Sequence, residues 1–313
     1  MDKSGKIVLT GAAGLVGQNL SVLLQESGYK NLVGIDKHPH NTGVLRELHP
    51  GMTVVQADLS KPGVWEQRYA DARAVVMLQA QIGGEMEEAF VANNVTATER
   101  VLAACRDHGV EYIIHISSSV LNSRARDFYV DTKRAQEQLV VESGIPSVVL
   151  RPTLMFGWFD RKHLGWLSRF MRRTPVFPVP GSGRYARQPL YIMDFCRIIR
   201  ACLERRPVGE VYDISGQEQV EYIDIIRAVR AATGSRTQIV PIPYRLFWTM
   251  LKLYALFDRD PPFTTRQLEA LVIPETFPVI PWGDIFGVRP TPFREAIQET
   301  FAESRFADVV LEF

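Results

Sequence analysis

The first 26 residues constrain the fold of this chain most strongly, because they read as a strand, a glycine-rich turn and a helix. Residues 6–11, "KIVLTG", are a short β-branched run typical of a buried parallel strand. The helix that follows has one apolar stripe, made of Leu15, Leu20, Leu23 and Leu24. The turn between them contains Gly11, Gly14 and Gly17. Such a turn lets backbone N–H groups approach a pyrophosphate at a helix N-terminus; the alternative is a tight turn without a ligand.

The alternation of strands and helices continues to about residue 157. Further strands are predicted at residues 31–37, 52–60, 72–81, 111–119 and 146–157. Helices are expected over residues 94–110 and from Tyr129 onward. Strands that alternate with helices form right-handed crossovers, so we predict an α/β fold with a doubly wound parallel sheet.

The composition of the sequence changes in its second half, where prolines and aromatic residues become frequent. We therefore expect a first domain over residues 1–157 and a smaller C-terminal lobe over residues 158–313, part of which returns to the sheet. Four residues of the lobe share a helical stripe: Leu246, Met250, Leu253 and Phe257. Core packing is the default expectation for this stripe, with membrane-surface docking or a hydrophobic aglycone site as alternatives.

Composition narrows the class of protein. The formal net charge of the 313 residues is +1, which provides no field to attract nucleic acid. The three cysteines form no CxxC pair and read as small buried side chains: Cys105, Cys196 and Cys202. No run approaches the ~20 apolar residues of a membrane span. A cytoplasmic protein without a metal ion is the expectation.

Two acidic residues at strand ends bear on the cofactor. Asp36 ends the second predicted strand, 19 residues after Gly17, where an acid binds the ribose hydroxyls of NAD and disfavours NADP. Lys37 and His38 follow it and weaken that preference. Asp58 ends the third strand and could meet the adenine edge or cap a helix.

The stretch "DFYVDTKRAQEQL" places Tyr129 and Lys133 on one face of a helix. Spacing alone is equally compatible with a lysine that covers a half-buried tyrosine. Together with the glycine turn, and with serines at the end of the preceding strand, the pair is interpreted as catalytic.

The ordered motifs extend over nearly the whole chain: "TGAAGLVG", "VVMLQAQ", "NNVTATERVL", "IIHISSS", "YVDTK", "LRPTLMFG" and "YARQPLYIMDF". In this order they resemble the extended short-chain dehydrogenase/reductase superfamily, in particular its nucleotide-sugar epimerase and dehydratase group. The resemblance implies a Rossmann-type sheet that binds NAD, followed by a substrate-binding lobe.

The resemblance also implies roles for single residues. Tyr129 matches the catalytic acid/base, Lys133 the amine beside it, and Ser118 the hydroxyl that binds the reacting oxygen. Ser119 is the alternative to Ser118 and, with Arg187, is expected to contact substrate, Arg187 at the diphosphate. Asn94 and Asp194 match residues of structural importance. The expected cofactor-binding residues are Gly11, Gly14, Leu15, Val16, Gly17, Asp36, Asp58, Leu59, Leu78, Gln79, Ala80, Tyr129, Lys133 and Pro152.

The implied chemistry is oxidation of a sugar alcohol, with hydride passing to nicotinamide and the proton to a base. A free tyrosine has a pKa near 10, which makes it a poor base at neutral pH. An adjacent ammonium and the positive nicotinamide ring favour the phenolate and lower the pKa of Tyr129. Ser118 donates to the developing oxyanion.

The sequence departs from the family pattern in two places. Only eleven positions separate Ser118 from Tyr129, a shorter substrate-binding excursion than in most relatives. Arg124 and Arg126 lie in it and could meet an anion or remain solvated. Dehydratases of the family carry an Asp-Glu pair where this chain has Ser119 and Val120, which argues against 4,6-dehydration.

Three hypotheses for function remain. The first is an NAD-dependent epimerase that acts on a nucleotide-activated sugar by transient oxidation. The second is an NAD(P)-dependent ketoreductase or dehydrogenase with net redox turnover. The third is a non-catalytic nucleotide-binding accessory subunit that docks through residues 244–257. A homodimer built from the helices near Glu88 and Tyr129 is also expected.

Overall fold

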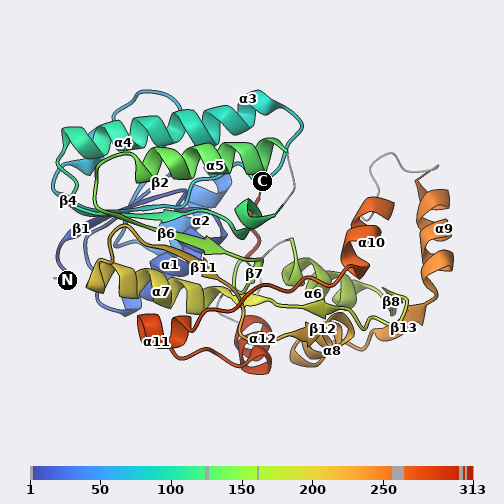
Figure 1. The fold of residues 1–313 in the computed structure, drawn as a ribbon. Helices are drawn as coiled ribbons and strands as arrows, with labels where there is room; N and C mark the ends of the chain where they lie inside the picture. Colours follow the sequence, from blue (N-terminus) through green and yellow to red (C-terminus); the bar gives the residue numbers. More distant parts are fainter. Residues whose placement is uncertain are drawn as a thin grey trace.

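The computed structural model describes residues 3–123, 127–160, 162–255, 264–302, 306 and 309–312. A seven-stranded sheet forms its centre, in the order β11-β6-β5-β4-β1-β2-β3 (Figure 1). All neighbouring strands of this sheet are parallel. The strands are β1 (Lys6–Thr10), β2 (Leu32–Asp36), β3 (Thr53–Gln56), β4 (Ala72–Met77), β5 (Ile113–Ile116), β6 (Ser147–Pro152) and β11 (Val211–Ile214). The order reverses between β1 and β4, so the predicted doubly wound fold is confirmed.

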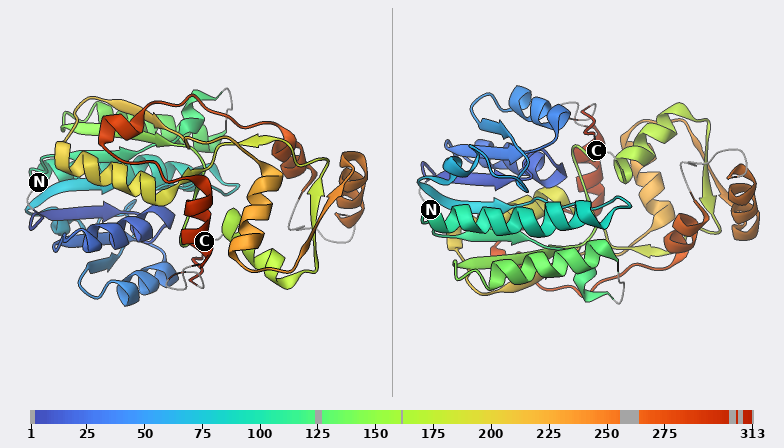
Figure 2. Two further views of the ribbon diagram at one scale, coloured as in Figure 1. Left: turned by 90° about the horizontal axis from the view of Figure 1, so that it is seen from below. Right: turned by 90° about the horizontal axis from the view of Figure 1, so that it is seen from above.

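Helices cover both faces of the sheet. α4 (Ala97–Asp107) and α5 (Phe128–Val141) lie on one face, and α1 (Leu15–Glu26) and α7 (Ile192–Arg205) on the other (Figures 1 and 2). α2 (Pro39–Leu48) follows β2 and packs near β3. Residues predicted to face inward are buried, among them Leu20, Leu24, Val101 and Leu102. The three cysteines are free and buried, as predicted.

Short elements connect this framework. They are the 3₁₀ turns η1 (Glu66–Tyr69) and η3 (Ser119–Asn122), α3 (Glu87–Phe90) and the π-helical segment η2 (Val91–Thr96). The helix predicted over residues 94–110 is therefore divided, with its first turn in the wider π geometry and its last helical residue at Asp107. π-helical turns often occur at functional sites.

The second half of the chain returns to the sheet. β11 pairs with β6 at one edge, with Val211 opposite Val149. α7 packs against α1, and α11 (Trp282–Phe286) packs against α7. These elements extend the framework laid down by the first half.

The remaining elements form a smaller lobe beside the carboxyl ends of the strands (Figure 2). Its helices are α6 (Leu164–Arg173), α8 (Tyr222–Ala232), α9 (Tyr244–Tyr254), α10 (Thr265–Val272) and α12 (Phe293–Ala302). Its strands are β7 (Met155–Phe156), β8 (Val176–Pro180), β9 (Ala186–Arg187), β10 (Leu190–Tyr191), β12 (Val220–Glu221) and β13 (Gln238–Ile242). They pair as β8 with β13, β9 with β12 and β7 with β10.

The stripe of α9 corrects one expectation. Leu246, Met250 and Leu253 are exposed rather than packed in a core, and α9 has no buried residue. The helix packs against α10, and periodicity cannot tell which apolar stripe finds a partner. Phe257 lies outside the described residues. Among the residues that are described, no helix is both long and apolar enough to cross a bilayer.

Candidate active site

The glycine turn is shaped by close backbone contacts. Gly11 has φ +64°, and a Cβ on it would lie 2.7 Å from the backbone nitrogen of Gln79. A Cβ on Gly17 would lie 2.3 Å from the carbonyl oxygen of Ala12. Gly14 precedes α1, whose first turn contains the predicted residues Leu15 and Val16. Larger residues at Gly11 or Gly17 would push apart the backbone segments that shape the turn.

Asp36 ties this turn to the end of β2. Its carboxylate accepts hydrogen bonds from the backbone N–H of Ala13 at 3.0 Å and from that of His38 at 3.0 Å. Each carboxylate oxygen can accept a second hydrogen bond, so both keep capacity for a hydroxyl group. Lys37 is directed elsewhere, because its ammonium donates to Asn93 at 2.8 Å. The preference for NAD over NADP predicted from Asp36 therefore has a geometric basis.

The end of β4 forms the neighbouring wall. The backbone N–H of Leu78 donates to the carbonyl oxygen of Thr10 at 3.1 Å, and the Thr10 hydroxyl donates to the Gln79 amide oxygen. Gln79 is buried and Ala80 is exposed. Pro152 ends β6 and is buried. These predicted cofactor residues thus follow strands whose carboxyl ends meet at one edge of the sheet.

Asp58 lies beyond β3 in a turn of its own. Its carboxylate accepts from the N–H of Ser60 at 3.0 Å and from the Ser60 hydroxyl at 2.7 Å. Burial raises the pKa of Asp58, but these hydrogen bonds and the charges of Lys37 and Lys61 outweigh it and lower the pKa. Leu59 beside it is buried. Of the two roles left open for Asp58, contact with adenine or capping, the hydrogen bonds fit capping, although Asp58 caps a turn rather than a helix.

The residues around the glycine turn fit NAD. The cradle at Gly11 is one that a side chain would fill, the N-terminus of α1 faces it, and Asp36 has free acceptor capacity beside it. Gly11, Gly14, Gly17 and Asp36 are the residues that would hold the cofactor.

Ser118 and Tyr129, the predicted reactive pair, lie within hydrogen-bond distance of each other. Ser118 follows β5 and caps η3, where its hydroxyl accepts from the N–H of Val120 at 3.4 Å. Burial raises the pKa of Tyr129, a hydrogen bond with Ser118 lowers it, and the charge of Asp127 raises it, leaving the pKa above its usual value. This direction is opposite to the one predicted from Lys133. Ser119, the alternative serine, is also buried.

Lys133 explains the difference. It is 1% exposed, and its ammonium donates to the carbonyl oxygen of Ile116 at 2.8 Å and to the Gln136 amide oxygen at 2.6 Å. Burial lowers the pKa of Lys133 to about 7, against a smaller opposing effect of Glu137. Among the described residues, no hydrogen bond joins its ammonium to the Tyr129 phenol. The amine is therefore held one turn below the phenol by the end of β5.

Gln136 was missed by the sequence analysis. It is fully buried, and its amide nitrogen donates to Thr98 at 2.9 Å and to the carbonyl oxygen of Gln79 at 3.2 Å. Together with Gln79 and Thr98 it links Lys133 to the wall beside the glycine turn. Its position three residues after Lys133, on the same helix face, was the available signal.

Two further buried groups surround Lys133. Glu137 pairs with Arg151 through hydrogen bonds of 3.0 Å to Nε and 2.5 Å to Nη2. His115 is fully buried, and burial together with the charge of Lys133 holds its pKa well below the usual value. Burial and the charge of Lys133 thus both favour the neutral form of His115.

Asn94 supports the approach to the site. It is fully buried in η2, accepts from the N–H of Gln81 at 2.6 Å and donates to the Thr132 hydroxyl at 3.0 Å. It joins the loop after β4 to α5, three positions from Tyr129, which fits the structural role that the resemblance implies.

A cavity of about 340 Å³ lies between α6, α8 and the loop after β6. Its lining is mostly apolar and also includes five polar or charged residues: Lys162, His163, Arg187, Gln188 and Glu275. Ser118, Tyr129 and Lys133 are not among the residues that line it. Arg187 donates to the carbonyl oxygens of Leu271 and Ile273, the latter at 2.7 Å. Arg187, which is predicted to bind the diphosphate, thus lines the cavity. Its guanidinium also holds the end of α10 and the residue that follows the helix.

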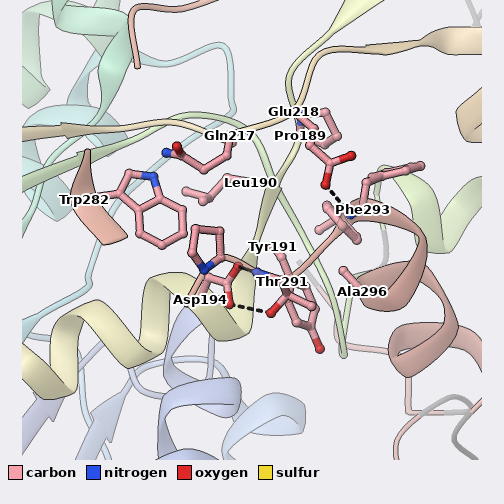
Figure 3. Close-up of a pocket in the computed structure, with 13 residues that line it drawn as sticks. Pro189, Leu190, Tyr191, Asp194, Gln217, Glu218, Trp282, Thr291, Phe293 and Ala296 are labelled. Atoms are coloured by element: carbon pink, nitrogen blue, oxygen red, sulfur yellow. Dashed lines mark hydrogen bonds between the residues drawn. The ribbon is translucent and has the colours of Figure 1, made fainter. Parts of the chain in front are cut away.

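Asp194 holds the returning chain. Its carboxylate accepts from the N–H of Thr291 at 2.8 Å and from the Thr291 hydroxyl at 2.7 Å (Figure 3). It also accepts from Arg197 at 2.6 Å. The cavity beside it has room for about one water molecule, at about 20 Å³. Asp194 is therefore structural, as the resemblance implies. Arg124 and Arg126 lie outside the described residues.

Comparisons with known proteins agree with this geometry. The model of the NAD dependent epimerase/dehydratase family matches residues 7–215. The 2-alkyl-3-oxoalkanoate reductase of Stenotrophomonas maltophilia is 26% identical, over 91% of this chain and 94% of its own. The low-salt glycan biosynthesis protein Agl12 of Haloferax volcanii is 27% identical, over 74% and 84%.

A solved structure shares the fold over almost the whole length. The UDP-glucuronic acid 4-epimerase of Bacillus cereus, solved in complex with NAD, is 24% identical. It superimposes with a TM-score of 0.68 over 95% of this chain and 97% of its own. The small lobe, and not only the sheet, therefore follows a known arrangement.

Proposed function

The chain belongs to the NAD-dependent epimerase/dehydratase family, and on that premise we propose that it epimerises a nucleotide-activated sugar by transient oxidation at a hydroxyl-bearing carbon. The observation that carries the proposal is the reactive pair Ser118 and Tyr129, with Lys133 buried one helical turn away, at the same sheet edge as the glycine turn. The presence of Ser118, Tyr129 and Lys133 together favours catalysis over a non-catalytic accessory subunit.

NAD, when bound, would supply the acceptor and the source of the hydride at the substrate carbon. Tyr129 removes the proton from the substrate hydroxyl. After the keto intermediate has turned its opposite face toward the hydride donor, Tyr129 returns the proton to the same oxygen. Ser118 donates a hydrogen bond to that oxygen while its charge develops. Lys133, whose pKa burial lowers to about 7, is proposed to favour the phenolate of Tyr129 in its protonated form once NAD is bound, because without the cofactor burial keeps the pKa of Tyr129 raised.

The substrate is proposed to occupy the 340 Å³ cavity and to extend toward Ser118. The apolar part suits a nucleobase, and the edge with Lys162 and Arg187 suits the diphosphate. For this, Arg187 would exchange at least one of its bonds to the carbonyl oxygens of Leu271 and Ile273 for a phosphate oxygen. Ser119 would contact the sugar beside Ser118. The absence of an acidic pair at Ser119 and Val120 excludes 4,6-dehydration from the proposal.

A homodimer belongs to the same proposal. α4 and α5 lie side by side on one face of the sheet, where Phe128 and Val141 are exposed (Figure 1). Two copies that meet through these helices would cover both side chains.

Net reduction of a ketone is the second candidate. The mostly apolar lining of the cavity favours it, as does the engagement of Arg187 with backbone carbonyl oxygens. The similarity to a 2-alkyl-3-oxoalkanoate reductase, whose name states a keto acid with alkyl chains, points the same way.

One experiment separates the two candidates. The purified chain is incubated with a panel of UDP- and dTDP-hexoses without added cofactor, and the sugars are followed by NMR, with Tyr129→Phe as the inactive control. Appearance of an epimer supports the first proposal. No epimer, together with consumption of NADH or NADPH when a 2-alkyl-3-oxoalkanoate is offered, contradicts it and supports the second.

A further inference from the structure

Helix α9 presents an apolar stripe that no described part of the chain covers. Leu246, Met250 and Leu253 are 54%, 51% and 55% exposed. At 3.6 residues per turn they fall on one side of the helix. Trp248 lies about half a turn away and donates to Glu269 of α10 at 3.3 Å. The stripe therefore points away from the helix that supports α9.

The position of α9 leaves this stripe accessible. Figures 1 and 2 show the helix at the end of the small lobe farthest from the N-terminus, beyond β8 and β13. An isolated exposed leucine on a surface is ordinary, but three on one face of a helix without buried residues form a patch that favours binding.

The charge around the stripe identifies what covers it. α9 has no acidic residue and carries Arg245 and Lys252 along one border of the stripe. The outer elements of the lobe, within residues 164–180, 222–255 and 265–272, contain nine lysines and arginines and two acidic residues, Asp224 and Glu269, the second of which accepts the hydrogen bond from Trp248. Asp224 is paired with Arg227 at 2.9 Å. This end of the molecule is thus strongly basic in a chain whose net charge is +1.

We propose that α9 docks this protein on an anionic lipid bilayer, lying in the plane of the interface with its stripe among the acyl chains. An apolar face bordered by cations, with an aromatic residue, Tyr254, at the end of the stripe, is the pattern of interfacial helices. A second copy fits less well, because two copies joined here would bring two basic surfaces together. The proposal is independent of the reaction at Tyr129.

The test is co-sedimentation of the full chain with vesicles. One set is phosphatidylcholine and the other contains about one third phosphatidylglycerol, enough to give a negative surface potential. We expect binding to the anionic set that weakens with salt, because each cation near the surface strengthens binding about fivefold. Met250→Glu with Leu253→Glu should weaken it about tenfold or more.

The matched control is Val64→Glu with Val208→Glu, which adds the same charges at exposed valines of the sheet half, outside the proposed dimer interface. This control should bind as the wild type does, and both variants should keep its circular dichroism and melting temperature. Equal sedimentation of the helix variant and the wild type would overturn the proposal, as would wild-type protein that ignores the anionic vesicles. Light scattering that shows a dimer which the helix variant breaks, without vesicle binding, would assign the stripe to a second copy instead.

Discussion

The core beneath α5 buries a charged side chain, whereas the outer end of the small lobe exposes apolar ones. Beneath α5 a lysine is 1% exposed, with its ammonium bonded to Ile116 and Gln136. On α9, leucines and a methionine are more than half exposed while Arg245 and Lys252 stand at their side. A buried charge costs stability unless polar partners hold it, so its presence marks chemistry, whereas an exposed apolar stripe marks a contact with something else.

The largest expected effect is at the phenol. Tyr129→Phe removes one oxygen from the reactive pair and leaves the ring, so we expect turnover to fall about 10²–10⁴-fold with NAD affinity retained. Steady-state kinetics and calorimetry check this. Lys133→Met should cost a comparable factor, and the double variant little more, because Lys133 acts largely through Tyr129. Near-wild-type turnover of Tyr129→Phe on the true substrate would remove the catalytic interpretation of the core.

The contrast between core and lobe can be measured directly as stability. Leu20→Ala, in the fully buried face of α1, should lower the free energy of unfolding by about 2–5 kcal/mol. Leu253→Ala, on the exposed stripe of α9, should change it by less than about 0.5 kcal/mol. Urea titrations of both variants give the two values. A loss of several kcal/mol for Leu253→Ala would mean that the stripe is covered within this chain or by a second copy.

Arg187 lies between the two regions, and its substitution separates two possible roles, binding of the substrate diphosphate and support of the backbone near α10. If it holds a diphosphate, Arg187→Ala should weaken substrate binding about ten- to hundredfold while NAD affinity stays unchanged. If it only anchors the backbone at Leu271 and Ile273, the variant should instead melt at lower temperature and bind substrate normally. Calorimetry and thermal melts on the same preparation separate these outcomes.

The pH dependence of stability reports the buried lysine. Its pKa is about 7 in the folded chain and near 10.5 unfolded, so only the unfolded state binds this proton between those values. Lys133 should therefore make stability fall by about 1.4 kcal/mol per pH unit as pH drops from 10 to 7, with no further change below. The slope should disappear in Lys133→Met and persist in Lys61→Met, where the lysine is exposed. Equal slopes in all three proteins would place the Lys133 ammonium in water.

The smallest expected effect concerns the choice of cofactor. The wild type should bind NAD more tightly than NADP, because the Asp36 carboxylate repels a 2′-phosphate. Asp36→Asn keeps the shape and can accept from only one of the two backbone N–H groups, that of Ala13 or that of His38, and it removes the charge. It should narrow the ratio of the NAD and NADP affinities about fivefold, equivalent to about 1 kcal/mol. Calorimetric titration with both cofactors checks this, and tighter binding of NADP by the wild type would contradict it.

The sequence predicted those parts of the molecule that depend on local pattern. Strand and helix alternation, the glycine turn and the Tyr129–Lys133 spacing are each contained within a few residues, and the structure has them at the predicted positions. Contacts between distant segments were not predictable. The carbonyl oxygens that engage Arg187 belong to residues 84 and 86 positions later, and Gln136 became significant only through Thr98 and Gln79.

The stripe of α9 shows the same limit from the other side. The periodicity of residues 244–254 correctly predicts a helix with one apolar face. Core packing was the wrong expectation, because the sequence of a helix does not indicate which other segment packs against it. The prediction that the pKa of Tyr129 is lowered was wrong for a related reason. Burial of the phenol and the distant partners of Lys133 decide the direction of the shift.

In the proposed reaction a sugar carbon is oxidised by losing a hydride and is reduced again when the same hydride returns to it. The most direct measurement is NMR of the epimer formed by the wild-type protein in D₂O. Because hydride leaves the carbon and returns to it without exchange with water, the account predicts protium at the inverted carbon. Deuterium at that carbon would show inversion by removal of a proton, and would contradict the role assigned to Ser118, Tyr129 and Lys133.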